Sequence, residues 1–120
     1  MKFVANYKKV HWTSHIENKM RYYGLSKQRM RRVFKSPDRR EFGIAPETTA
    51  VMQTVGTKKY PTEIWLMYQS IQSEKEKLVN MISAWRYPGI SPKDKSPIIP
   101  EDTILELERL KQKINENKTS

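Results

Sequence analysis

The sequence predicts an α+β fold, in which two N-terminal helices pack on a small antiparallel sheet and one more helix is appended at the C-terminus. Capping residues and helical apolar spacing mark residues 14–36, strand-like runs follow as far as residue 87, and an apolar stripe returns after residue 101. A chain of 120 residues has room for one domain with one modest core. We expect an α+β domain over 1–88, a proline-rich linker over 89–100 and an amphipathic C-terminal helix over 101–120.

The first helix is predicted from its two ends. Ser14, followed three residues later by Glu17, forms a capping box that opens a helix over about 15–23. Gly24 supplies the left-handed residue on which helices commonly end. Helical spacing places Ile16, Met20 and Tyr23 on one side of this helix, and His15, Lys19 and Tyr22 on a neighbouring side.

The second helix follows after a two-residue turn. Ser26 can cap a helix that runs over 26–35, and Pro37 stops it because proline disfavours helix in the residue before it. Its apolar stripe consists of Met30, Val33 and Phe34, and basic residues cover the rest.

Three strands are predicted in the middle of the chain. Residues 48–55 alternate as a half-buried strand does, and the unbroken apolar run within 63–71 indicates a central strand buried on both faces. Polar turns at 56–59 and 73–77 separate these from a strand over 78–87. Residues 3–12 and 42–45 are candidates for further short strands.

The strand over 78–87 is expected to alternate without interruption. One face would carry Leu78, Asn80, Ile82, Ala84 and Arg86, and the other Val79, Met81, Ser83, Trp85 and Tyr87. Pro88 and the three prolines of the linker, Pro92, Pro97 and Pro100, then make residues 88–100 stiff. A helix over about 102–116 follows, and its apolar stripe comprises Ile104, Leu105, Leu107, Leu110 and Ile114.

The net charge of +10 is concentrated in one segment, because residues 21–40 alone contribute +7. Such a patch attracts phosphate backbones or an acidic protein, and its plainest interpretation is a solvated basic face. The candidate nucleic-acid contacts are Arg21, Lys27, Arg29, Arg31, Arg32, Lys35, Arg39 and Arg40, with Lys58 and Lys59 at a turn and Trp85 as a possible base contact. Trp12, Trp65 and Trp85 are otherwise expected in the core.

Several classes of site are excluded by what the sequence lacks. Without cysteine there is no disulfide framework and no thiolate metal site, which fits a cytoplasmic protein. The two histidines have no metal-binding spacing, and the four isolated glycines form no phosphate-cradling loop. We therefore expect no metal and no cofactor. No apolar stretch has the length of a membrane helix and the N-terminus lacks a signal-peptide core, so no membrane role is expected.

RNA cleavage without a metal needs a group that accepts the 2′-hydroxyl proton, cations that hold the phosphate and an acid that protonates the leaving oxygen. The residues able to do this are His15, Lys19, Arg86, Tyr60 and Tyr87. The structural alternatives are a solvated helix histidine for His15 and a surface arginine at a strand end for Arg86.

Short motifs spread over residues 12–88 resemble the RelE/BrnT-like toxin superfamily and its uncharacterised relatives. The matching pieces, in order, are Ser14-His15, Arg21, Gly24-Leu25-Ser26, Ser36-Pro37-Asp38 and Met81-Ile82-Ser83-Ala84. The resemblance implies an α+β ribonuclease-toxin fold over the domain 1–88 and a metal-independent endoribonuclease of a toxin–antitoxin system. It also implies RNA as partner, in many relatives on the ribosome, and an acidic antitoxin protein.

Two other functions remain open. The chain can be a non-catalytic nucleic-acid-binding or regulatory protein, which predicts salt-sensitive RNA binding without a product. It can also be a protein-interaction module that uses the C-terminal helix, docked on a partner or on a second copy. The sequence leaves the oligomeric state open.

Overall fold

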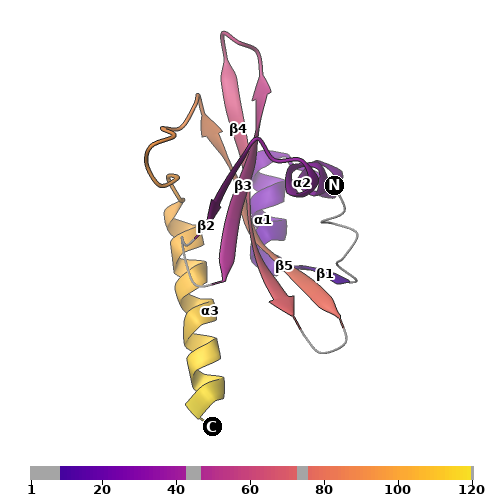
Figure 1. Cartoon of the computed structure of the whole chain (residues 1–120), viewed down its shortest axis with the longest axis vertical. Helices are drawn as coiled ribbons and strands as arrows, with labels where there is room; N and C mark the ends of the chain where they lie inside the picture. The colour runs from indigo at the N-terminus through magenta and orange to yellow at the C-terminus, as the bar shows by residue number, and fades with distance from the viewer. Residues whose placement is uncertain (1–8, 43–46, 73–75, 120) are drawn as a thin grey trace.

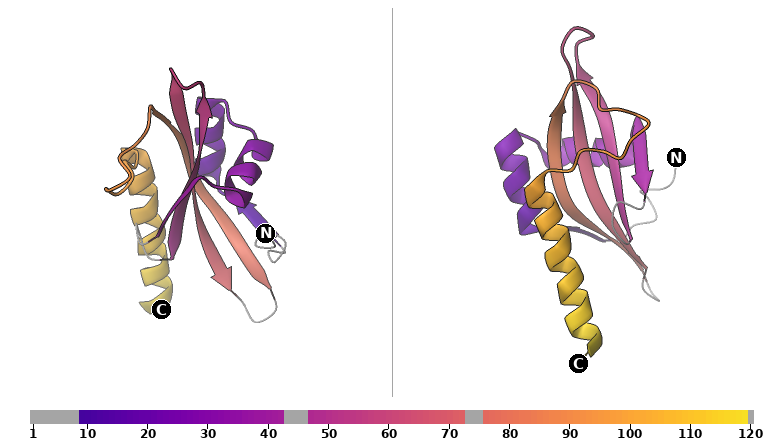
Figure 2. Two further views of the ribbon diagram at one scale, coloured as in Figure 1. Left: turned by 45° about the horizontal axis from the view of Figure 1, so that its top comes forward. Right: turned by 90° about the vertical axis from the view of Figure 1, so that its left-hand side faces the viewer.

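The chain folds into a five-stranded sheet between two helical layers, as the computed structural model shows for residues 9–42, 47–72 and 76–119 (Figure 1). In chain order the elements are β1 (Lys9–Trp12), α1 (Ser14–Tyr23), α2 (Lys27–Lys35), β2 (Arg39–Phe42), β3 (Thr48–Gly56), β4 (Pro61–Gln72), β5 (Lys77–Pro88) and α3 (Glu101–Thr119). Helices α1 and α2 cover one face of the sheet and α3 covers the other (Figure 2). The α+β class is confirmed, but the C-terminal helix forms a third layer.

The sheet is mixed, with the order β1-β5-β4-β3-β2. Strands β2 to β5 form the predicted antiparallel meander, whereas β1 pairs parallel to β5. The prediction of an antiparallel sheet is therefore wrong for its first strand. The candidate strand over 42–45 is replaced by β2, which begins at Arg39, and its residues 43–45 lie outside the described ranges, as do residues 3–8.

The face under α1 and α2 holds the larger core. Buried side chains of both helices meet alternate residues of the strands, and Phe34 packs edge-on against Tyr68 with ring centroids 4.7 Å apart. The apolar stripes predicted for the two helices are confirmed by this burial. The cluster comprises Ile16, Met20, Leu25, Met30, Val33, Phe34, Val51, Ile64, Leu66, Tyr68, Val79, Met81 and Ala84.

The face under α3 holds a smaller apolar cluster. Trp65 and Trp85 stack there with nearly parallel rings, 5.9 Å between centroids, which confirms the expected core position of both tryptophans. Ala50, Met52 and Met67 complete the buried set, and Tyr23, Tyr87, Ile99 and Leu107 pack against it. Ile104 and Leu105, predicted in the same stripe as Leu107, are exposed.

A bulge in β5 changes which residues face which layer. Ile82 has no partner in the register with β4, so it is an extra residue. Met81 and Ala84, on either side of it, therefore face the same core, while Trp85 faces α3. The uninterrupted alternation predicted for 78–87 is wrong because the two sets of residues exchange faces at Ile82.

Helix α1 is anchored to this bulge at its first turn. The hydroxyl of Thr13 accepts the Ile16 amide at 3.1 Å and lies 3.1 and 3.0 Å from the carbonyl oxygens of Met81 and Ile82. Thr13 is thus the N-cap, and Ser14, which the capping-box motif predicted for that place, is the first helical residue. One side chain therefore starts α1 and joins it to the edge of β5.

The other helix ends follow the predictions. Gly24 ends α1 in the left-handed conformation, with φ of 67°, and the Ser26 hydroxyl caps α2 by accepting the Arg29 amide at 3.0 Å. Among the described helices, none is both long and apolar enough to cross a membrane.

Candidate functional site

Three of the predicted catalytic residues lie along the seam between α1 and β5. His15 and Lys19 are one turn apart on α1, and Arg86 stands in the second half of β5. The Nε of Arg86 donates to the carbonyl oxygen of Tyr23 at 3.0 Å, so the arginine reaches the end of α1. The seam is thus lined by an imidazole, an ammonium and a guanidinium.

His15 is half-buried, contacts β5 directly and is linked to α3 through two hydroxyl groups. Its Nε2 lies 3.1 Å from the Oγ of Ser83 on β5, and this oxygen lies 2.8 Å from the Oγ1 of Thr103 on α3. Both hydroxyl residues are buried. The imidazole is therefore held in one orientation by a chain of hydrogen bonds that ends in the first turn of α3.

Lys19 makes the second contact with that turn. Its Nζ donates to both carboxylate oxygens of Asp102, at 3.0 and 2.8 Å, and lies 5.1 Å from the centre of the Tyr23 ring. The side chain of Lys19 is only 11% exposed, whereas that of Asp102 is 53% exposed. A nearly buried ammonium is stable only beside an anion, and Asp102 supplies it.

Asp102 remains an anion well into the acid range. Burial alone would raise its pKa, but the hydrogen bonds from Lys19 and the positive charges of Lys19 and His15 outweigh that effect, with a smaller contribution from the Thr103 backbone. The pKa of Asp102 therefore lies below its ordinary value of 3.8. At neutral pH a full negative charge stands over Lys19.

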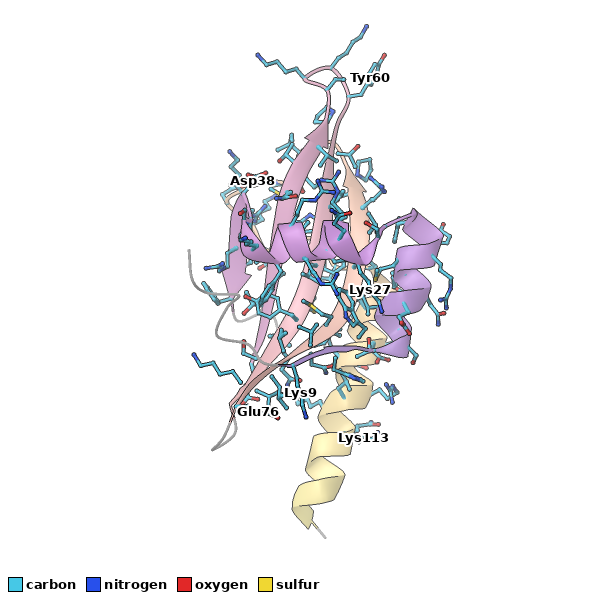
Figure 3. The ribbon with its side chains drawn as sticks, turned by 90° about the vertical axis from the view of Figure 1, so that its right-hand side faces the viewer. Lys9, Lys27, Asp38, Tyr60, Glu76 and Lys113 are labelled. Carbon is cyan, nitrogen blue, oxygen red and sulfur yellow. The ribbon has the colours of Figure 1, made fainter. Side chains whose placement is uncertain are left out.

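The two predicted catalytic tyrosines lie away from the seam residues. Tyr60 stands at the tip of the β3–β4 hairpin, 72% exposed, with the Lys59 ammonium 5.6 Å from its ring centre (Figure 3). Tyr87 packs against the apolar cluster under α3. The structure thus brings His15, Lys19 and Arg86 to one seam and places both tyrosines elsewhere.

Helix α2 carries five of the ten predicted basic phosphate ligands, and it lies across the sheet in Figure 3. Trp12 packs below it, with the Lys27 ammonium 5.2 Å and the Arg31 guanidinium 5.7 Å from its ring centre. Both cations are attracted to the ring and stay on the surface. Six of the predicted phosphate ligands in this region are exposed: Lys27, Arg31, Arg32 and Lys35 on α2, Arg21 on α1 and Arg40 on β2. Arg29 on α2 is half-buried.

The turn between β3 and β4 adds two exposed lysines, Lys58 and Lys59. Gly56 makes this tight turn possible, because its φ is 89° and a Cβ there would stand 2.5 Å from the Tyr60 carbonyl oxygen. The amide of Tyr60 also donates to the Thr57 hydroxyl at 3.0 Å.

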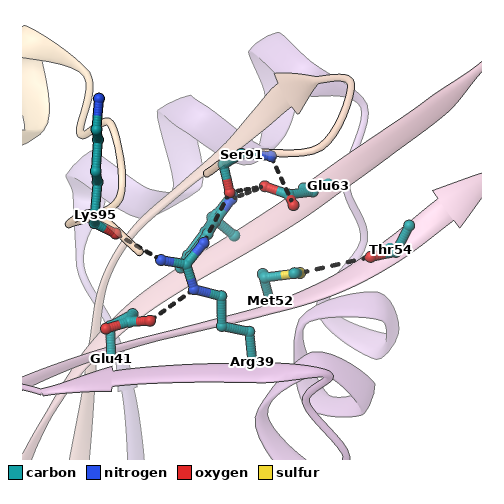
Figure 4. A network of polar contacts seen from close by, with 8 residues as sticks. Arg39, Glu41, Met52, Thr54, Glu63, Ser91 and Lys95 are labelled. Atoms are coloured by element: carbon teal, nitrogen blue, oxygen red, sulfur yellow. Dashed lines mark hydrogen bonds and ion pairs between the residues drawn. The ribbon is translucent and has the colours of Figure 1, made fainter. Parts of the chain in front are cut away.

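Arg39 differs from the other predicted phosphate ligands because its side chain is engaged inside the protein (Figure 4). Its guanidinium donates to a carboxylate oxygen of Glu41 at 2.6 Å, to the Ser91 hydroxyl at 3.0 Å and to the Lys95 carbonyl at 2.8 Å. The guanidinium therefore holds the segment before α3 against the sheet.

Glu63 on β4 also belongs to this network, because it binds Ser91. It is fully buried, and its carboxylate accepts hydrogen bonds from the Ser91 hydroxyl at 2.6 Å, the Ser91 amide at 3.1 Å and the Trp65 indole at 3.0 Å. A buried carboxylate that accepts three hydrogen bonds holds Ser91, and with it the segment 89–95, firmly against the sheet. No local feature of the sequence indicates this role.

Trp85, the predicted base contact, is 1% exposed and stacked on Trp65. Its ring has no face open to a nucleotide base in this arrangement. Within the described part of the chain its indole nitrogen is buried without a hydrogen-bond partner.

Three residues of the seam were not proposed from the sequence as site residues. Ser83, Asp102 and Thr103 meet α1 only in the folded chain, since Asp102 is 83 positions from Lys19 and Ser83 is 68 from His15. Ser83 does belong to the strand motif noted in the sequence. Asp102 lies in the first turn of α3, where acidic residues are common, so its position in the sequence does not indicate a site.

Among residues 9–42, 47–72 and 76–119, no three acidic, histidine or cysteine side chains gather in a way that could hold a metal ion. Comparisons of the chain with protein-family models, with characterised proteins and with solved structures find no match.

Proposed function

We propose that this protein binds RNA and holds the sugar–phosphate backbone on the outer side of α2. The observation that carries the proposal is the exposure of four cationic side chains on one short helix whose opposite side is buried in the core. Phosphate contacts of this kind release counterions, so binding should be strong at low salt and weaken steeply as salt rises. The four residues are Lys27, Arg31, Arg32 and Lys35.

Single-stranded RNA fits the remaining surface better than a duplex. At the hairpin tip an exposed tyrosine ring, Tyr60, stands beside two lysines, and such a ring can stack on an unpaired base. The resemblance to RelE/BrnT-like toxins also favours RNA over DNA.

A second candidate function is metal-independent cleavage of the bound RNA, favoured by the three seam residues. His15 would take the proton of a 2′-hydroxyl, whose oxygen then bonds to phosphorus as the bond to the 5′-oxygen breaks. Lys19 would donate a proton to the departing 5′-oxygen, and Arg86 would hold the phosphate oxygens while charge builds. The products would be a 2′,3′-cyclic phosphate end and a free 5′-hydroxyl end.

RNA binding is tested by removing two charges from α2. We expect Arg32→Gln/Lys35→Gln to flatten the dependence of log affinity on log salt by about 1.4, at roughly 0.7 per lost phosphate contact on single strands. The control, Lys111→Gln/Lys113→Gln, removes the same charge from exposed positions on α3. Equal effects of the two pairs would leave only a general charge effect and contradict a binding face on α2.

Cleavage is tested by incubating the protein with mixed RNA in EDTA beside the double variant His15→Ala/Arg86→Ala. Products from the wild type alone would support catalysis at the seam, and full activity of the variant would exclude that mechanism. Intact RNA with a shifted gel band would mean binding without catalysis. Intact RNA without a shift would contradict the RNA proposal and direct the search to a protein partner of α2 or α3.

A further inference from the structure

We propose that the first turn of α3 closes an RNA-phosphate site at the α1–β5 seam, and that the carboxylate of Asp102 occupies the place of the phosphate. The site itself consists of Lys19, His15 and Ser83. This inference rests on the proposed RNA function and adds a mechanism that regulates the seam.

The site has the character of a built anion site. The Lys19 ammonium is nearly buried, is oriented by the Tyr23 ring and directs its hydrogen bonds to two oxygens of one anionic group. His15 is close enough to Asp102 to lower the pKa of its carboxyl group. A phosphodiester of RNA offers two non-bridging oxygens that share one negative charge, as the two oxygens of the carboxylate do.

The present occupant is exposed on its outer side. About half of the Asp102 side-chain surface is open to solvent, at 53%, while the lysine beneath it is 11% exposed. A ligand can therefore approach from the outside and compete for Lys19. An exchange of one anion for another leaves the buried ammonium paired throughout, which avoids the cost of an uncompensated buried charge.

A single local movement would change the surroundings of both predicted catalytic side chains. Asp102 holds Lys19, and the next residue, Thr103, holds His15 through Ser83. Both residues belong to one helical turn, so displacing it releases the ammonium and frees the Ser83 hydroxyl, which contacts the imidazole, from Thr103.

The chain before α3 allows such a movement without unfolding the sheet. Residues up to Lys95 are fastened by Arg39 and Glu63, and the short stretch 96–100, in which Ile99 packs against the cluster under α3, connects this network to the helix. On the helix side Leu107 is the described apolar contact with the sheet cluster, and it is half-buried. The first turn can therefore shift while the network around Glu63 stays in place.

The proposal is tested on the full chain with Asp102→Asn, using Glu101→Gln as the matched control. Both variants remove one negative charge from the same turn, but only Asp102 contacts Lys19, and asparagine keeps its shape. With single-stranded RNA as the probe, we expect Asp102→Asn to steepen the salt dependence by about 0.7, one extra phosphate contact, and Glu101→Gln to leave it unchanged. In the double variant Lys19→Gln/Asp102→Asn the gain should disappear.

A second measurement uses the wild type and avoids any effect of a variant on folding. Saturating RNA should accelerate hydrogen exchange of the Thr103 and Ile104 amides, which donate to the Pro100 carbonyl in the closed state at 3.0 and 3.1 Å. Unchanged or slower exchange there would overturn the proposal. Equal salt slopes for the two single variants would also overturn it, while RNA binding through α2 would stand. A chain that binds no RNA in any variant would contradict both proposals.

Discussion

The two faces of the sheet are held in different ways. On the α1 and α2 side, two helices cover one continuous apolar cluster in which Phe34 meets Tyr68. On the α3 side, the cluster is smaller, and a polar network around Glu63 and an ion pair between Lys19 and Asp102 do much of the fastening. Apolar burial stabilises in proportion to area, whereas an ion pair with a half-exposed carboxylate contributes little, so the first face should be the more stable one.

This difference separates two functions within one small domain. Helix α2 presents its positive charges to solvent while its other side is packed in the apolar core, and RNA binding there requires no movement of the helix. The first turn of α3 is held by the ion pair between Lys19 and Asp102, which water, salt or a competing anion can replace. The following predictions, from the largest expected effect to the smallest, compare the two layers.

Substitution Phe34→Ala should have the largest effect on stability, because it removes a fully packed ring from the main core. We expect a loss of about 3–5 kcal/mol in the free energy of unfolding, measured by urea denaturation. A loss below about 1 kcal/mol would contradict the claim that this face dominates stability.

Substitution Glu63→Ala should have the next largest effect, about 2–3 kcal/mol, because three buried hydrogen-bond donors lose their acceptor. Faster hydrogen exchange at the Ser91 amide would show that the segment before α3 has come loose. The variant Glu63→Gln retains one acceptor oxygen and serves as the control, with a smaller loss. If Glu63→Gln is as damaging as alanine, the negative charge rather than the hydrogen bonding is what matters.

Substitution Leu107→Ala should cost about 1 kcal/mol, since this side chain is only half-buried against the tryptophan cluster. The same urea measurement applies. A loss as large as that of Phe34→Ala would mean that α3 is as firmly integrated as α2, and the contrast between the faces would fail.

The Asp102–Lys19 pair should contribute least, because solvent screens the half-exposed carboxylate, and it should contribute only above the acid range. Because the pKa of Asp102 lies below 3.8 in the folded chain, its stabilisation is present above that value and is lost as the pH falls through the folded pKa. The difference in unfolding free energy between the wild type and Asp102→Asn should thus be largest near neutral pH and shrink in acid. A difference that grows in acid would have the wrong sign. Glu101→Gln should show no such trend.

Local signals predicted the elements that depend on neighbouring residues. Gly24, Ser26 and Pro37 bound the two helices correctly because caps and stops act within a few positions. The apolar run of β4 likewise marked a strand buried on both faces. The N-cap was misplaced by one residue, since Thr13 is selected by the distant β5 edge as well as by the helix.

Features that depend on distant partners were not predictable. The bulge at Ile82 reverses the faces of the second half of β5, and nothing in the local alternation marks it. In the candidate site, helical spacing correctly put His15 and Lys19 on one side of α1. Their partners Thr103 and Asp102 come from the far end of the chain, where acidic and hydroxyl residues are ordinary helix starters.

The parallel pairing of β1 with β5 sets an order for folding during synthesis. The first strand and the Thr13 cap meet carbonyl groups nearly 70 positions later, at Met81 and Ile82, so they cannot dock until β5 has left the ribosome. Contacts this distant in sequence form slowly. The apolar sides of α1 and α2 therefore stay uncovered while the meander is being made, and the nascent chain depends on that interval being short or chaperoned.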